Sequence, residues 1–395
     1  MNSELSFPHH TYQHLPSEED YEIVPTDLAP PITDPQPADV PSVEQRLHEA
    51  GVKEIILVHG TFVGNDAAGV LREVARISPR LAGAMKRLGK HVFDQVTGEI
   101  GNYTDSFAQR LSGLVNADGQ PKNNSIPVTR LHWSGENHHL GRAGGAIALL
   151  DYLFQSDLTS EDRVLVWGHS HGGNVLAMLS HLVGGTDAAR NRFFKATRSH
   201  YRDPILGRLD LPQWEDVQSQ LADAEQRSRL PRIDAANFGV PLRYRWNREV
   251  VPRILNFVQH RPLDPEQPAM ASVPESIRDV IKATGGDYVQ QLGIGGTDFL
   301  HSAFAWRSWN AEQRLQRIFE GGIRRRDLLR NLRKCLRVSL DGTTLLVDYP
   351  DTQKKWNKKI VGHGVYTRHE WLPFHLNEIA NRIYGETKDS TEASP

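Results

Sequence analysis

Runs of consecutive apolar residues, most of them ending at a glycine or a polar residue, recur along the chain. Such runs, without polar alternation, are typical of strands that are buried on both faces of a sheet. Two such runs predict strands at 54–60 (EIILVHG) and 163–168 (RVLVWG), and further strand-like segments lie at 126–133, 233–239, 253–260 and 343–348. For the last of these, Asp341 and Gly342 make either a hairpin turn between two short strands or the entry to one final sheet strand.

Segments with helical periodicity alternate with these strands, at 66–88, 104–115, 142–155, 174–182 and 371–384. Strands that alternate with helices predict an α/β fold with a mostly parallel sheet covered on both faces. Two longer, mostly helical stretches interrupt the alternation. We expect residues 186–230 to form a cap above the sheet and residues 265–337 to form a helical insertion.

The first 45 residues differ in kind from the body at 46–385. They contain nine acidic residues, no Lys or Arg, and eight of the 23 prolines, which leaves the remainder with 39 acidic against 46 basic residues, a net charge of +7. This composition predicts a flexible or polyproline-like leader. The alternative is an ordered arm that docks on the body through Tyr12, Tyr21, Ile23 and Val24. Residues 386–395 are predicted to be a flexible tail.

The composition excludes several classes of protein. With 38% hydrophobic and 24% charged residues, the chain can bury a core, which argues against wholesale disorder, collagen and coiled coil. The single cysteine, Cys335, forms no internal disulfide, so a reducing compartment and a cytoplasmic location are expected. No apolar run approaches the roughly 18 residues that a membrane span needs, and no secretory signal begins the sequence.

The sharpest chemical motif is Gly168-His169-Ser170-His171-Gly172, which lies between an apolar strand and an apolar helix. A serine on such a turn is exposed above the carboxyl end of the sheet, where a nucleophile is needed. The alternative is a glycine-rich turn that cradles a phosphate. A dinucleotide fingerprint would place G-x-G-x-x-G in the first strand–helix unit, however, and that unit contains VHGTFVGND instead.

Three motifs together resemble the α/β-hydrolase family, and within it the serine esterases and lipases. They are GHSHGG around Ser170, ILVHGTF at 56–62, and the Phe-Gly-x-Pro segment within 237–241. The resemblance implies that Thr61 and His171 supply the backbone N–H groups of an oxyanion hole. It also implies that Phe62 and apolar residues of the cap shape an acyl pocket, and that no cofactor is required.

The resemblance further implies a catalytic triad in the chain order serine, acid, histidine. His363, between two glycines soon after the last strand, is the expected base, with His369 and His375 as alternatives and His301 as a further candidate. Asp264, just past a strand end, is the first choice for the acid, and Asp298 is the second. Asp287, in GGDYVQ, is a further rival.

Two other clusters suggest further functions. The histidines 132, 138 and 139 suggest a metal site, but no Cys or H-E-x-x-H accompanies them, so solvated loop histidines are the favoured interpretation. The basic run at 324–337 is interpreted as a solvated helix face rather than a phosphate or lipid site, and no nucleic-acid module is present.

The predicted function is hydrolysis of small-molecule or lipid carboxylic esters. Acyl transfer on the same site, or a non-catalytic scaffold whose leader docks a protein partner, are the alternatives.

Overall fold

A computed structural model gives the structure of the chain. It describes residues 7–8, 16–25, 42–61, 103–116, 125–203, 207–261, 266–271, 274–294, 306–320, 323, 327, 336–349 and 360–385. The predicted helix at 66–88, most of the basic run at 324–337 and the C-terminal tail lie outside the described residues.

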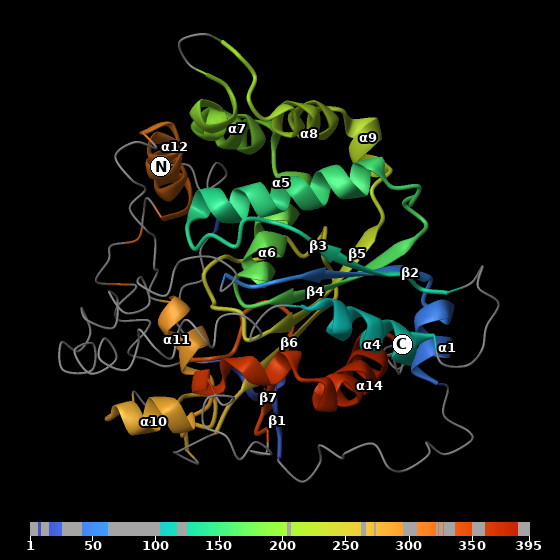
Figure 1. The fold of residues 1–395 in the computed structure, drawn as a ribbon, viewed down its shortest axis with the longest axis vertical. Coiled ribbons are helices and arrows are strands. Elements are labelled where there is room, and N and C mark those ends of the chain that lie inside the picture. The colour runs from blue at the N-terminus through green and yellow to red at the C-terminus, as the bar shows by residue number, and fades with distance from the viewer. Residues whose placement is uncertain are drawn as a thin grey trace, which may run out of the picture.

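A parallel β-sheet forms the centre of the molecule (Figure 1). In the described part of the chain it has seven strands in the order β1-β7-β6-β5-β4-β2-β3, and every pairing between them is parallel. The strands are β1 (Tyr21–Val24), β2 (Val52–Val58), β3 (Val128–Leu131), β4 (Arg163–His169), β5 (Arg232–Phe238), β6 (Ile254–Gln259) and β7 (Thr343–Val347). The predicted α/β class is confirmed, and β7 is the single final strand.

Neighbouring residues of the central strands alternate between two hydrophobic cores. In β4, Val164 and Val166 belong to one core, whereas Leu165 and Trp167 belong to the other, and all four side chains are fully buried. A strand with apolar contacts on both faces needs no polar positions, which explains the uninterrupted apolar runs.

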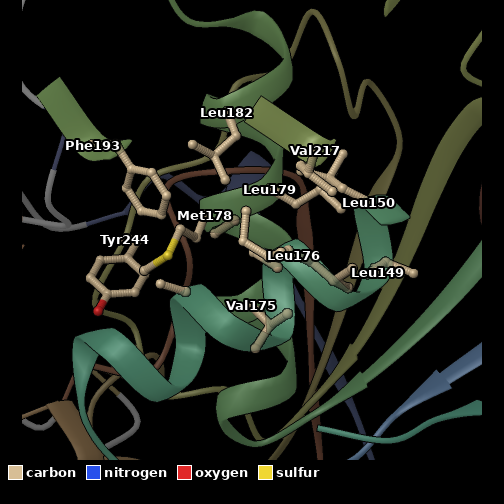
Figure 2. Packing of buried hydrophobic residues seen from close by; sticks show 14 of the residues in the cluster. Leu149, Leu150, Val175, Leu176, Met178, Leu179, Leu182, Phe193, Val217 and Tyr244 are labelled. Atoms are coloured by element: carbon tan, nitrogen blue, oxygen red, sulfur yellow. The ribbon is translucent and has the colours of Figure 1, made fainter. Parts of the chain in front are cut away.

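Helices cover both faces of the sheet (Figure 1). On one face lie α5 (His139–Gln155) and α6 (His171–Gly184); on the other lie α1 (Val43–Glu49), α4 (Asp105–Val115) and α14 (Leu372–Ile383). Figure 2 shows leucines of α5 and α6 packed together, with Phe193 and Val217 contributed from outside this layer. None of the described helices has the length and apolarity that crossing a bilayer requires.

The two longer stretches contribute further helices. The first contains α7 (Asp187–Tyr201), α8 (Pro212–Ala222) and α9 (Ala224–Ser228), and α8 packs on α5 (Figure 1). The second contains α10 (Ile277–Lys282), α11 (Tyr288–Ile294) and α12 (Trp306–Glu320), and α12 packs against α7 and α5. Short 3-10 helices span Glu18–Asp20, Ile360–Thr367 and His369–Trp371.

Parts of the N-terminal leader are ordered on the body. Tyr21–Val24 forms β1, which pairs with β7 at one edge of the sheet. The buried ring of Phe7 packs against Phe193 of α7 and Phe319 of α12. Of the four residues through which an ordered arm was expected to dock, Val24 is buried and Tyr21 packs on a hydrophobic cluster, Ile23 is exposed, and Tyr12 lies outside the described residues.

The order of the strands reverses next to β2. The chain passes from β2 outward to its neighbour β3 and then returns to the opposite side of β2 to form β4. In open parallel sheets, ligands bind in the crevice outside the carboxyl ends of the strands at such a reversal. The segments that follow β2 and β4, which contain Thr61 and Ser170, lie at that point.

Candidate active site

Ser170 occupies the turn between β4 and α6 in a strained conformation. Its backbone angles are φ 51° and ψ −129°, outside the regions that L-residues usually adopt. Its N–H donates to the carbonyl of Phe238 in the adjacent strand at 2.9 Å, and its carbonyl accepts from Gly173 at 3.1 Å. These bonds fix a sharp strand-to-helix turn of the kind that presents a nucleophile.

The segment after β2 lies directly against this turn. A Cβ atom built on Gly60 would approach the Cβ of Ser170 to 2.7 Å and Nδ1 of His169 to 3.1 Å. Only a residue without a side chain permits such an approach. The two predicted motifs, separated by more than a hundred residues in the sequence, therefore meet in one site.

Trp133, which the sequence analysis did not single out, supports the segment after β2. Its indole ring stacks on His59 at 5.4 Å between centroids, and its Nε1–H donates to the carbonyl of His59 at 3.0 Å. Burial lowers the pKa of His59, although bonds to the backbone at Gly60 and Trp133 oppose this effect. The segment that leads to Thr61 is thus held by contacts on both the ring and the backbone of His59.

Thr61 and His171, the predicted oxyanion-hole residues, are both buried. His171 is the first residue of α6, a position whose backbone N–H has no partner within the helix. Its ring Nδ1 lies 3.2 Å from the amide nitrogen of Asn174 and 3.5 Å from a guanidinium nitrogen of Arg142. Because both neighbours are donors, this ring nitrogen is an acceptor. Phe62 lies outside the described residues.

His363 pairs with a carboxylate beside the serine turn. Its Nδ1 lies 2.7 Å from Oδ2 of Asp287, and both side chains are buried. The ring of His363 lies 4.7 Å, centroid to centroid, from the ring of His169, the residue immediately before Ser170. The predicted base is therefore next to the nucleophile turn and has an aspartate on its Nδ1.

Asp287 is held as an anion by several donors. Its Oδ1 accepts from the N–H of Gln290 at 2.9 Å, and its Oδ2 accepts from the hydroxyl of Tyr366 at 2.9 Å as well as facing His363. Burial acts to raise the pKa of Asp287, but the contact with His363, the Gln290 N–H and the charge of Arg337 bring it below its ordinary value. The carboxyl group is therefore ionised at neutral pH.

After the chain leaves the sheet at the end of β6, it returns to the carboxyl end of that strand at Gly286 and Asp287. Gly286 forms a β-bridge with His260, and the N–H of Asp287 donates to the carbonyl of Gln259, the last residue of β6, at 2.9 Å. From the sequence, Asp287 is only a rival candidate for the acid. Asp264 and Asp298, the preferred candidates, lie outside the described residues.

The alternative histidines have other surroundings. His375 is fully buried in α14, where its Nε2 meets the hydroxyl of Tyr349 at 2.8 Å, and burial lowers its pKa to about 3. The ring of His369 lies 6.1 Å from that of Phe107. His301 lies outside the described residues. Of these described candidates, His363 is the one that the structure pairs with a carboxylate.

Two of the three clustered histidines hold the first turn of α5. His138 accepts from the N–H of Gly141 at 2.8 Å, and Nδ1 of His139 meets the hydroxyl of Tyr244 at 2.5 Å. Within the described ranges, no group of three or more His, Cys, Asp or Glu side chains is arranged to hold a metal ion. The interpretation as solvated loop histidines is therefore wrong for His138 and His139, which are buried at the start of α5 and have structural contacts there, whereas His132 is exposed.

Comparisons with known proteins add nothing to this geometry. The chain matches no protein-family model, no curated protein and no solved structure. Its function must therefore be inferred from the chemistry of the site.

Proposed function

We propose that the chain is a serine hydrolase of carboxylic esters with an α/β-hydrolase fold. The observation that carries the proposal is the buried Asp287–His363 pair beside the strained turn at Ser170, at the point where the strand order of the sheet reverses. A histidine oriented by a carboxylate is the base that a serine hydroxyl needs to become a nucleophile.

In the proposed mechanism, Ser170 Oγ attacks the ester carbonyl while His363 Nε2 accepts the hydroxyl proton. Asp287 holds the Nδ1 proton of His363 and stabilises the imidazolium that forms. The backbone N–H groups of Thr61 and His171 stabilise the tetrahedral oxyanion. His363 then protonates the departing alcohol, which leaves an acyl-Ser170 ester. Water, deprotonated by His363, attacks that ester, and His363 returns the proton to Ser170 Oγ as the carboxylic acid is released.

An ester with an aliphatic acyl chain is the proposed substrate, by analogy with the esterases and lipases that the motifs resemble. Buried positions of Ser170 and His363 fit a reaction that is shielded from bulk water. The single cysteine of the chain fits a cytoplasmic enzyme.

Labelling with a fluorophosphonate probe and turnover of nitrophenyl esters of graded chain length test the proposal. Wild type should be labelled and active, whereas Ser170→Ala should lose labelling and at least about 10³-fold in kcat. Ser180→Ala is the matched control, because Ser180 is a buried serine within α6, the helix that begins directly after Ser170, and its hydroxyl donates to the carbonyl of Ala177. It should still be labelled.

Two outcomes would redirect the proposal. A folded wild type that neither reacts with the probe nor hydrolyses any ester would contradict it and favour the scaffold alternative. Labelling together with preferential transfer of the acyl group to an added alcohol would instead favour an acyltransferase.

A further inference from the structure

The hydroxyl of Tyr366 makes two hydrogen bonds whose directions are fixed. The backbone N–H of Gln259 donates to the hydroxyl oxygen at 2.7 Å, and the hydroxyl lies 2.9 Å from Oδ2 of Asp287. A backbone amide only donates, so the phenol hydrogen is committed to Asp287. His363 Nδ1 approaches the same oxygen at 2.7 Å. One carboxylate oxygen therefore accepts from both Tyr366 and His363.

The backbone of Gly239 also lies close to Oδ2 of Asp287. Gly239, at the end of β5, has φ +59°, and a Cβ atom there would lie 2.7 Å from Oδ2 of Asp287 and 2.5 Å from Cε2 of Tyr366. The glycine of the Phe-Gly-x-Pro segment thus makes room for the carboxylate and for the tyrosine ring. With Gln290 bonded to Oδ1, the carboxylate is held on each of its oxygens.

We propose that Tyr366 is a positioning residue for Asp287, which orients and tunes the carboxylate toward His363. This inference rests on the proposed serine hydrolase. The chain of donors from Gln259 through Tyr366 to Asp287 polarises cooperatively, and it withdraws negative charge from the oxygen that faces the imidazole. The hydroxyl of Tyr366 acts through Asp287, because it is bonded to that carboxylate and to the backbone, whereas the ring of Tyr366 also lies 6.0 Å, centroid to centroid, from the ring of His363.

Tyr366→Phe removes the hydroxyl and keeps the ring. We expect kcat for nitrophenyl esters to fall about tenfold with KM nearly unchanged, because orientation of the base matters in the transition state and not in substrate binding. The acid limb of the kcat/KM profile should move to higher pH. Without the hydrogen bond from Tyr366, Oδ2 of Asp287 keeps more negative charge, which stabilises the imidazolium of His363. An unchanged profile together with an unchanged kcat would overturn the proposal.

Tyr349→Phe is the matched control. Tyr349 is equally buried, its ring lies 5.9 Å from that of Tyr366, and its hydroxyl bonds His375 rather than the acid. It should lose a comparable amount of stability in urea and keep the wild-type kcat and pH profile. Equal losses of kcat in both variants would show that any buried hydroxyl has the same effect, which contradicts a specific role for Tyr366.

A double-mutant cycle tests whether Tyr366 acts through Asp287. Tyr366→Phe should have no further effect on kcat in an Asp287→Asn background, because the oriented carboxylate is already lost. A further tenfold loss would contradict the proposal. If Tyr366→Phe does not fold, a fluorinated tyrosine at position 366 preserves the contact and strengthens the donor. The acid limb should then move to lower pH, and a shift to higher pH would overturn the proposal.

The imidazole Nδ1–H resonance of His363 separates this inference from the proposed function. It is recorded by NMR in Ser170→Ala, which needs no substrate. Tyr366→Phe in that background should move the resonance, whereas Tyr349→Phe should not. A resonance that moves, combined with a wild type that hydrolyses no ester, would refute the hydrolase and leave the role of Tyr366 toward Asp287 standing. A resonance that does not move would overturn that role.

Discussion

Gly60 and Ser170 belong to segments that are distant in the sequence, yet their main chains meet at the carboxyl end of the sheet. The space between them is smaller than one methyl group, because a Cβ atom on Gly60 would lie 2.7 Å from that of Ser170. Ser170 cannot easily move away from position 60, since its strained backbone is fixed by hydrogen bonds to Phe238 and Gly173. The site therefore depends on the absence of a side chain at position 60.

Gly60→Ala should reduce kcat/KM and the rate of fluorophosphonate labelling by about 100-fold, because the nucleophile must shift from its position. The control is Gly144→Ala in α5, whose Cβ atom would lie 4.0 Å from Cζ2 of Trp214, an ordinary contact. The control should keep full activity and gain about 0.5–1 kcal/mol in stability, as alanine does over glycine inside a helix. Equal activity of both variants would contradict this account of Gly60.

The sequence predicts the serine and the histidine of the candidate site better than the acid. Ser170 and Thr61 follow apolar strands directly, so the strand pattern places them, and His363 follows the last strand between two glycines. Asp287 depends on the β-bridge between His260 and Gly286, a tertiary contact made after the chain has left the sheet and returned. No local pattern encodes that return, and the first carboxylate after the strand, Asp264, was preferred instead.

At the scale of elements, the N-terminus of α5 is capped by a different helix. Both oxygens of the buried Glu312 in α12 accept from backbone N–H groups of the first turn of α5, at 3.1 Å from His139 and 2.7 Å from Leu140. A negative charge at this end also complements the helix dipole. These hydrogen bonds thus join α12, in the second insertion, to α5, which covers one face of the sheet.

Glu312→Ala should destabilise the protein by about 1–3 kcal/mol, because it leaves buried backbone donors without their acceptor. Urea unfolding gives the free energy, and hydrogen exchange at the amides of His139 and Leu140 shows where protection is lost. The control is Glu225→Ala, which removes an exposed ion pair with Arg229 and should leave the urea midpoint nearly unchanged. Comparable losses of unfolding free energy in the two variants would show that the hydrogen bonds of Glu312 stabilise the protein no more than an exposed ion pair does.

The sequence predicts strands correctly where the burial of their apolar side chains is enough to specify them. The six predicted strands are all present. β2, β4, β5, β6 and β7 each contribute buried apolar residues to two hydrophobic cores, whereas β3, at the edge of the sheet, is mostly half-buried. β1 was not predicted as a strand, since Tyr21–Val24 lies in an acidic, proline-rich leader and only its pairing with β7 defines it. Neighbouring structure, rather than local sequence, decides such edge elements.

At the scale of the whole molecule, the free energy of unfolding depends on pH because some histidines are buried without charge. Burial lowers the pKa of His375 to about 3, and burial together with the charge of Arg337 lowers that of His260 to about 3, against an ordinary value of 6.5. Between these values the unfolded chain binds protons that the folded chain excludes. These two histidines therefore make the free energy of unfolding fall as the pH decreases from 6.5 toward 3.

His375→Gln should flatten this dependence, because glutamine keeps an acceptor for the hydroxyl of Tyr349 and does not titrate. Each buried histidine contributes a slope of up to about 1.4 kcal/mol per pH unit, so the variant should lose about that much of the wild-type slope in urea unfolding between about pH 4.5 and 6. Burial acts to raise the pKa of Asp287, but the contact with His363 lowers it from its ordinary value, so Asp287 titrates on the acid side of this window. A variant with the slope of the wild type would mean that His375 takes up its proton without unfolding the cluster of Trp167, Phe238 and Phe257 around it.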